Sequence, residues 1–96
     1  MYNDLDPLLH SQLRLAIISM LVASEKVEFT YIQSETKAAA GNISIQVKKL
    51  EDAGYIKVEK TFKNNYPNTM LSITDKGVKA FESYVSDLKK YLNPKK

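Results

Sequence analysis

The hydrophobic pattern changes its period twice within one continuous run, from Ala38 to Gly77. Apolar residues first recur about every 3.6 positions, then alternate with polar residues, and then return to the longer spacing. The longer period is typical of a helix with one buried face, and the shorter period is typical of a strand. The run therefore predicts a helix, a two-stranded hairpin and another helix, in that order.

The length of 96 residues fits one domain, near the lower limit that a single hydrophobic core stabilises. No proline-, glycine- or serine-rich linker divides the chain, so we expect one unit over residues 1–96 with a short basic tail. The absence of cysteine excludes disulfides and thiolate metal sites. No stretch approaches about 18 uninterrupted apolar residues and the first residues are acidic, so we expect no membrane span, no secretion signal and a cytoplasmic location.

Positive charge is concentrated after the first third of the chain. Residues 1–36 hold two basic and five acidic side chains, whereas residues 37–66 and residues 67–96 each hold six basic and three acidic ones. A basic face attracts phosphates and releases counterions when it binds nucleic acid. A solvated surface with a chance asymmetry explains the same counts, so charge alone leaves both interpretations open.

The first third of the chain predicts two helices and a short strand. Ser11 can cap a helix whose apolar stripe begins at Leu13 and is wide enough to be buried on more than one side. Residues 27–29 alternate as a small strand does. Thr30 and Gln33 have the spacing of a capping box, which predicts a short helix over about residues 31–37.

A further helix is predicted over about residues 40–53, ended by Gly54, which can adopt the left-handed conformation that helix ends require. Ile43, Val47 and Leu50 share one face of this helix and are expected to be buried. The far side and flanks carry polar candidates for DNA contact together with one aliphatic residue: Asn42, Ser44, Ile45, Gln46, Lys48 and Lys49. Such groups read base edges and hold phosphates, although a plain solvated helix face has the same composition.

Residues 55–62 and 69–73 alternate between apolar and polar positions, as the two strands of a hairpin do. The connection between them is polar and rich in turn formers, and consists of Lys63, Asn64, Asn65, Tyr66, Pro67 and Asn68. Such a tip can reach a phosphate backbone or a minor groove beside a helix in the major groove. A solvated loop is the alternative, against which the aromatic Tyr66 argues. The pattern thus places a helix-turn-helix at about residues 30–54 and a wing at about 55–73.

Thr74 and Asp75 supply an N-cap and a first-turn acid for a last helix over about residues 75–92. Its apolar residues repeat at spacings of three and four, as in a short coiled-coil seam or in a helix packed within one subunit. Because the domain is small and both of its ends are rich in apolar residues, we favour a two-fold homodimer. The predicted interface residues are Leu5, Leu8, Leu9, Phe81, Val85, Leu88 and Leu92.

Three segments resemble winged-helix bacterial regulators of the MarR and ArsR type. Residues 42–56, NISIQVKKLEDAGYI, are similar to their recognition helix and the following strand. Residues 71–77, LSITDKG, resemble the exit from their wing, and residues 10–17, HSQLRLAI, resemble their first helix. The likeness spans nearly the whole chain and points to the short, single-domain MarR-like branch. It implies an α+β, mostly helical winged helix-turn-helix fold with terminal dimerisation helices, and two recognition helices in successive major grooves of a pseudo-palindromic operator.

The resemblance also assigns DNA contact to Ser44 and its neighbours, and two departures from the family pattern change the expected readout. Ala39 stands where these proteins often have a Ser or Thr helix cap, at a cost of about 1 kcal/mol and a phosphate contact. Ile45 stands where they commonly carry Arg, and the wing lacks their arginine. We therefore expect base readout by Asn42, Ser44 and Gln46, with Ile45 against a thymine methyl. Thr30 and Ala39 complete the candidate DNA-binding set.

The residues and the resemblance together predict a sequence-specific regulator of transcription that binds double-stranded DNA, as a dimeric repressor occluding a promoter. A winged helix used for protein–protein assembly is the alternative, because the contact positions lack arginine. An enzyme is not expected, since the lone His10 has no acid or nucleophile pattern near it. With one histidine and no cysteine we expect no metal site and no cofactor.

A small-molecule effector is left open by the resemblance, since MarR proteins often bind ligands between the DNA-binding lobe and the dimer helices. Tyr2, Tyr31, Tyr84 and Tyr91 could line such a cleft. Ordinary packing of amphipathic side chains explains these tyrosines more simply.

Overall fold

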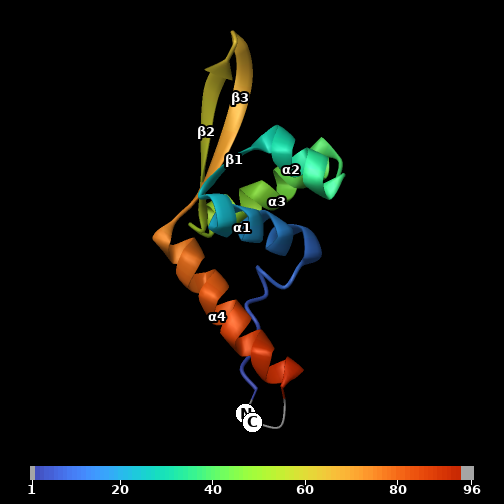
Figure 1. Cartoon of the computed structure of the whole chain (residues 1–96), viewed down its shortest axis with the longest axis vertical. Helices are drawn as coiled ribbons and strands as arrows, with labels where there is room; N and C mark the ends of the chain where they lie inside the picture. The colour runs from blue at the N-terminus through green and yellow to red at the C-terminus, as the bar shows by residue number, and fades with distance from the viewer. Residues whose placement is uncertain (1, 94–96) are drawn as a thin grey trace.

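The computed structural model describes residues 2–93 of the chain (Figure 1). Within these residues, four helices and three strands follow one another as α1 (Gln12–Ser24), β1 (Lys26–Glu28), α2 (Phe29–Thr36), α3 (Ala40–Asp52), β2 (Ile56–Lys63), β3 (Tyr66–Ile73) and α4 (Asp75–Leu92). The predicted α+β, mostly helical winged helix-turn-helix is confirmed. None of the helices in this part of the chain is both long enough and apolar enough to cross a membrane.

The core lies where α1, α2 and α3 meet the base of the sheet. The face of α3 that was predicted to be buried is buried, because Ile43, Val47 and Leu50 point inward together. The other fully or almost fully buried apolar residues come from every other element and from the N-terminal segment: Leu9, Ile17, Ile18, Leu21, Val27, Ile32, Ile56, Leu71 and Tyr84.

The sheet is antiparallel, with strand order β1-β3-β2. The short strand predicted at residues 27–29 is present one residue earlier, and it pairs with β3 so that Val27 lies opposite Leu71. Strands β2 and β3 form a long hairpin, the wing, which projects beyond the helices (Figure 1). The wing therefore rests on a third strand where it joins the domain.

The wing turn is shorter than predicted. Only Asn64 and Asn65 lie outside the strands, and both have positive φ, 53° and 67°. This combination is typical of a two-residue type I′ turn, which matches the twist of the strands it joins. The predicted six-residue connection is wrong, because Tyr66, Pro67 and Asn68 already belong to β3.

Two of the predicted helix caps are absent and one is confirmed. The capping box at Thr30 is wrong, because β1 runs directly into α2 and the helix begins at Phe29, with Glu28 at the N-cap. Ser11 does precede α1, but its side chain makes no capping hydrogen bond. Thr74 caps α4 as predicted, since its hydroxyl accepts a hydrogen bond from the Gly77 amide at 3.0 Å.

Helix α4 leaves the body of the domain, and the N-terminal segment runs back along it (Figure 1). The amide of Asn3 donates to Asp87 at 3.0 Å, and the Tyr91 hydroxyl donates to the Asn3 carbonyl at 2.9 Å. Closer to the core, His10 Nδ1 lies 3.0 Å from the hydroxyl of buried Tyr84. The N-terminal segment and α4 therefore form one arm, which is joined to the body through α1 and through β3.

The predicted dimer interface divides into core and surface residues. Leu9 has no exposed surface, so we assign it to the core of the subunit and not to an interface. The remaining predicted residues lie on the arm: Leu92 is 69% exposed, and Leu5, Leu8, Phe81, Val85 and Leu88 are half-buried. An apolar stripe that one chain covers incompletely is therefore present on α4.

Candidate nucleic-acid interface

The exposed face of α3 carries most of the predicted contact residues. Asn42, Ser44, Lys48 and Lys49 are exposed, and Ile45 is exposed over 57% of its surface. Burial of the opposite face fixes this orientation, because turning the helix would expose three fully or almost fully buried aliphatic residues. The helix thus presents short polar groups, one aliphatic group and two ammonium groups to the solvent side.

A short turn between α2 and α3 sets the start of α3, and no side chain caps the N-terminus of this helix. Lys37 ends α2 with a left-handed backbone at φ 57°. Ala39 has the extended backbone of an N-cap, φ −66° and ψ 143°, and carries no side-chain acceptor. Ala39 thus occupies the N-cap position of α3, as predicted. Thr30, the other candidate outside α3 and the wing, lies exposed in the first turn of α2.

Gln46 is the one predicted α3 contact whose side chain is not exposed. It is half-buried, and its Oε1 accepts a hydrogen bond from Nη1 of Arg14 on α1. Its Nε2 donates to Oδ1 of Asn42 at 3.0 Å. Sequence reasoning missed Arg14, although a signal existed: it is the only charged residue of α1, and a charge in an apolar helix usually has a partner.

The two lysines of α3 differ in their surroundings. Lys48 pairs with Asp52 at 3.0 Å, one turn further along the helix, and this hydrogen bond raises the pKa of the Lys48 ammonium. The pair is exposed, so it contributes little to stability. Lys49 forms no ion pair with any other residue in the range 2–93. Lys49 is therefore the better placed of the two to hold a phosphate.

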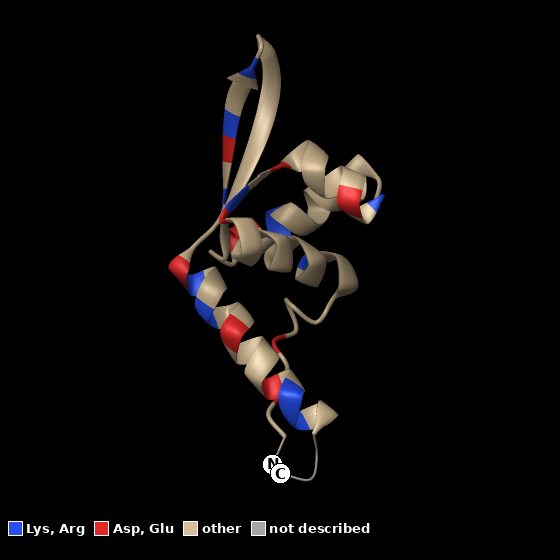
Figure 2. Ribbon diagram, viewed as in Figure 1, with Lys and Arg blue, Asp and Glu red and all other residues tan. Residues whose placement is uncertain are grey.

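The wing carries basic side chains along β2, at Lys57, Lys60 and Lys63, with one acid between them (Figure 2). Lys63 pairs with Glu28 at 2.9 Å, and the Asn68 amide donates to the same carboxylate at 3.4 Å. The hydrogen bond from Lys63 lowers the pKa of Glu28. Glu28 therefore links the wing to β1, and its carboxylate binds two of the predicted DNA-contacting side chains, Lys63 and Asn68.

Aromatic side chains are exposed at the end of the wing. Tyr66, which was predicted there, is 73% exposed, and Phe62, which was predicted only as a strand residue, is 76% exposed. Phe62 pairs with Pro67, four pairs beyond Val58 and Leu71, so the alternation places it on the core-facing side of the sheet past the point where the core ends. Counting the alternation outward from the core would have identified it.

A groove of about 430 Å³ separates α3 from the wing. Its walls include Ser44, Val47 and Lys48 on the helix side and Val58, Lys60 and Thr69 on the wing side. Ser44 and Lys48 are the predicted contacts that line this groove, whereas the predicted wing contacts at residues 63–68 are not among its walls.

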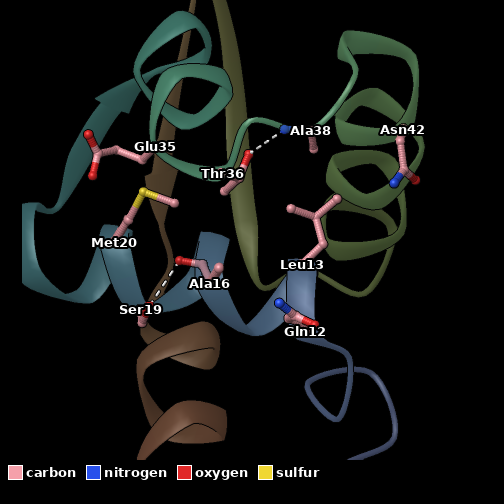
Figure 3. Close-up of a pocket in the computed structure, with 9 residues that line it drawn as sticks. All are labelled: Gln12, Leu13, Ala16, Ser19, Met20, Glu35, Thr36, Ala38 and Asn42. Atoms are coloured by element: carbon pink, nitrogen blue, oxygen red, sulfur yellow. Dashed lines mark hydrogen bonds between the residues drawn. The ribbon is translucent and has the colours of Figure 1, made fainter.

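A second hollow, of about 510 Å³, lies between α1, α2 and the start of α3 (Figure 3). Leu13 and Met20 line it together with Glu35, and Asn42 closes it on the α3 side. Three of the four tyrosines considered for a ligand cleft instead pack within the chain. Tyr84 is buried against His10, and the rings of Tyr2 and Tyr91 lie 4.9 Å apart; Tyr31 is exposed on α2.

Comparison with known proteins identifies the family. A family model described as a winged helix DNA-binding domain matches residues 13–92. An uncharacterized protein of Methanocaldococcus jannaschii is 30% identical over 79 residues, which cover 82% of this chain and 86% of that protein.

Solved structures agree with this match. The transcriptional regulator homologue of Pyrococcus horikoshii is similar with a TM-score of 0.85 and 29% identity, covering 91% of this chain and 86% of that one. PadR of Bacillus subtilis, solved in complex with operator DNA, is similar with a TM-score of 0.69 and 24% identity, covering 78% of this chain and 48% of that one. The resemblance to winged-helix regulators of the MarR type fits these matches, and the family is one of DNA-binding domains and not of enzymes.

Proposed function

Because the chain belongs to the family of winged helix DNA-binding domains, we propose that it is a sequence-specific regulator of transcription that binds double-stranded DNA. The observation that carries this proposal is the concave surface formed by α3 and the wing. An α-helix fits the major groove of B-DNA, and a projecting hairpin beside it reaches the adjacent backbone or minor groove. Similarity to the Pyrococcus horikoshii regulator homologue and to PadR, which was solved on operator DNA, supports the same assignment.

Each part of the surface has its own task. Asn42, Ser44 and Ile45 on the first turns of α3 read base edges, because the N-terminal residues of a recognition helix approach the bases. Lys49 and the lysines of β2 bind phosphates, which adds affinity without selecting a sequence. Asn64 and Asn65 at the wing turn, with the exposed ring of Tyr66 beside them, follow the neighbouring groove or backbone.

The regulator acts as a two-fold dimer joined through the arms. The support for this step is the α4 stripe of Phe81, Val85, Leu88 and Leu92, which the described residues of one chain leave partly uncovered. A partner's stripe would bury it. Two recognition helices related by a two-fold axis read half-sites about one helical turn apart, so the operator is pseudo-palindromic. Bound at a promoter, the dimer represses transcription by occlusion.

A small-molecule effector is a further part of the proposal, and the hollow bounded by Leu13, Met20 and Asn42 is where it would act. A ligand there would lie against the first turn of α3.

The experiment is a selection of genomic fragments by the purified protein, followed by footprinting of the enriched site. We expect one protected region with two half-sites about 10 base pairs apart. Enrichment of no fragment over competitor DNA would contradict the proposal.

Assembly with another protein is the second candidate function. It is favoured by one observation: Lys48 and Lys63 are engaged by Asp52 and Glu28, which lowers the free positive charge of the interface. An assembly module would bind a protein partner through α3 and would lack specific, salt-sensitive binding to duplex DNA. The footprinting experiment separates the two candidates.

A further inference from the structure

Arg14 connects the N-terminal segment to the recognition helix through a chain of hydrogen bonds. Its Nε donates to the carbonyl oxygen of Leu8 at 2.6 Å, and its Nη1 donates to Oε1 of Gln46. Gln46 in turn donates from Nε2 to Oδ1 of Asn42 at 3.0 Å. The chain therefore begins in the arm and ends at an exposed side chain in the first turn of α3.

The chemistry of arginine fixes the direction of every bond in this chain. A guanidinium has donors only, whereas each amide has one acceptor oxygen and one donor nitrogen. Gln46 must therefore turn its carbonyl toward Arg14, which leaves its amino group facing Asn42. Asn42 must then turn its own carbonyl toward Gln46, which occupies one lone pair of that oxygen and leaves the amino group as the main polar group on the solvent side.

This direction matters because an asparagine can recognise different bases. The bidentate asparagine–adenine pair needs the carbonyl and the amino group of one amide to face the base together. A side chain that presents mainly its amino group is matched by acceptors, and guanine offers two adjacent acceptors, O6 and N7, in the major groove. The adenine N6 amino group would instead meet a second donor.

We infer that Arg14 is a positioning residue that makes Asn42 a hydrogen-bond donor and so selects guanine at the base pair that Asn42 faces. This inference rests on the proposed function, since it names the base chemistry read by the same surface. It also gives the arm a route to the DNA-reading face, because Leu8 holds the other side of the guanidinium.

The test is selection of binding sites from a randomised duplex library, with Asn42→Ala used to identify the base position that Asn42 reads. Wild-type protein should prefer guanine at that position by about tenfold, the size expected of a good paired contact. Arg14→Ala should relax the preference there to less than about threefold and leave other positions unchanged. Lys49→Ala is the matched control, since loss of a phosphate contact should weaken all sites equally.

A second variant tests the direction of the bonds and keeps Arg14 in place. In Gln46→Glu the new carboxylate has acceptors only, so it still binds Arg14 but can no longer donate to Asn42. Asn42 should then turn its amino group inward and its carbonyl outward, and the preferred base should change to one with a donor, cytosine N4 or adenine N6.

The outcomes separate this inference from the function on which it rests. A wild-type protein that selects no site overturns the proposed function and the inference together. A wild-type protein that selects a site, with the same base preferred by Arg14→Ala and Gln46→Glu, overturns the inference alone. A relaxed preference in the first variant and a reversed preference in the second support it, because a merely structural role of Arg14 would not reverse a base preference.

Discussion

Gly77 lies in the first turn of α4, where the helix crosses the chain entering β2, and no larger residue fits there. A Cβ added at Gly77 would lie 2.2 Å from the carbonyl oxygen of Tyr55 and 2.8 Å from Cγ1 of Ile73. Contacts of a real Cβ are essentially never below 3.0 Å, so the backbone would have to separate by about 0.8 Å, the difference 3.0 − 2.2. The same Tyr55 carbonyl accepts a hydrogen bond from the amide of Thr74 at 3.0 Å, so the shift would strain the α4 cap.

The change Gly77→Ala should therefore destabilise the fold. Overpacking costs about 1–3 kcal/mol and a weakened hydrogen bond about 1 kcal/mol more, whereas alanine in a helix regains about 1 kcal/mol over glycine. The net loss of about 1–3 kcal/mol should lower the melting temperature by at least about 4 °C. Thermal unfolding followed by circular dichroism, at one protein concentration for all variants, measures this.

Gly41→Ala is the matched control for the same chemical change. Gly41 lies in the first turn of α3, and a Cβ built there meets no atom within 4 Å. Alanine should therefore raise the stability by about 0.5–1 kcal/mol. A Gly77→Ala protein that melts at or above the wild-type temperature would refute the reasoning, and a Gly41→Ala protein that melts well below it would refute the control.

Three further predictions concern single sites. Ala39→Ser should raise the free energy of unfolding by about 1 kcal/mol in urea titration, because it adds the missing acceptor at the N-cap of α3; an unchanged midpoint would contradict this. Burial and the hydrogen bond that the Tyr55 hydroxyl donates to Asp6 at 2.6 Å raise the pKa of Tyr55 to about 12. The protonated hydroxyl therefore stabilises the folded state fully below pH 10.0, and this contribution is lost as the pH rises toward 12. Absorbance titration at about 295 nm should show a late ionisation step that Tyr55→Phe lacks, and a variant that retains this step would count against the assignment. Phe62→Ser and Tyr66→Ser should leave the melting temperature within about 3 °C of wild type, because both rings are exposed, but should weaken binding to the selected duplex; unchanged affinity would remove the wing tip from the interface.

The sequence predicted those features that follow from local periodicity and from residues with special backbone preferences. Helix α3 was found to within one residue, because its apolar stripe is regular and Gly54 adopts φ 81° just beyond its end. The cap at Thr74 was found because a threonine hydroxyl bonds locally to the backbone amide three residues later.

The wing turn was predicted too long because Pro67, a residue typical of turns, is also compatible with the strand position that it occupies. Lys63 and Tyr66 close a two-residue turn, so the next pair, Phe62 and Pro67, falls at a non-hydrogen-bonded position of the ladder. Proline has no amide hydrogen, and at that position none is needed by β2. Pro67 can therefore belong to β3, although the sequence pattern assigned it to the connection.

The polar connections of the site could not be predicted because they join distant parts of the chain. Arg14 and Gln46 are 32 residues apart, and Lys63 and Glu28 are 35 apart. Periodicity shows which face of an element is buried but not which side chain of another element lies opposite it. Both pairs are apparent only from the three-dimensional arrangement of the helices and the wing.

The most direct test of the account is the salt dependence of binding to the selected duplex, measured by fluorescence anisotropy between about 50 and 200 mM salt. The account predicts that log Kd rises linearly with log salt, and that Lys48→Ala/Lys49→Ala lowers the slope by about 1–2, since each lost phosphate contact removes about 0.9. We expect Lys49→Ala alone to cause most of this change, because Lys48 is shared with Asp52. Binding that is insensitive to salt, or a slope that the double variant leaves unchanged, would contradict the placement of α3 against DNA.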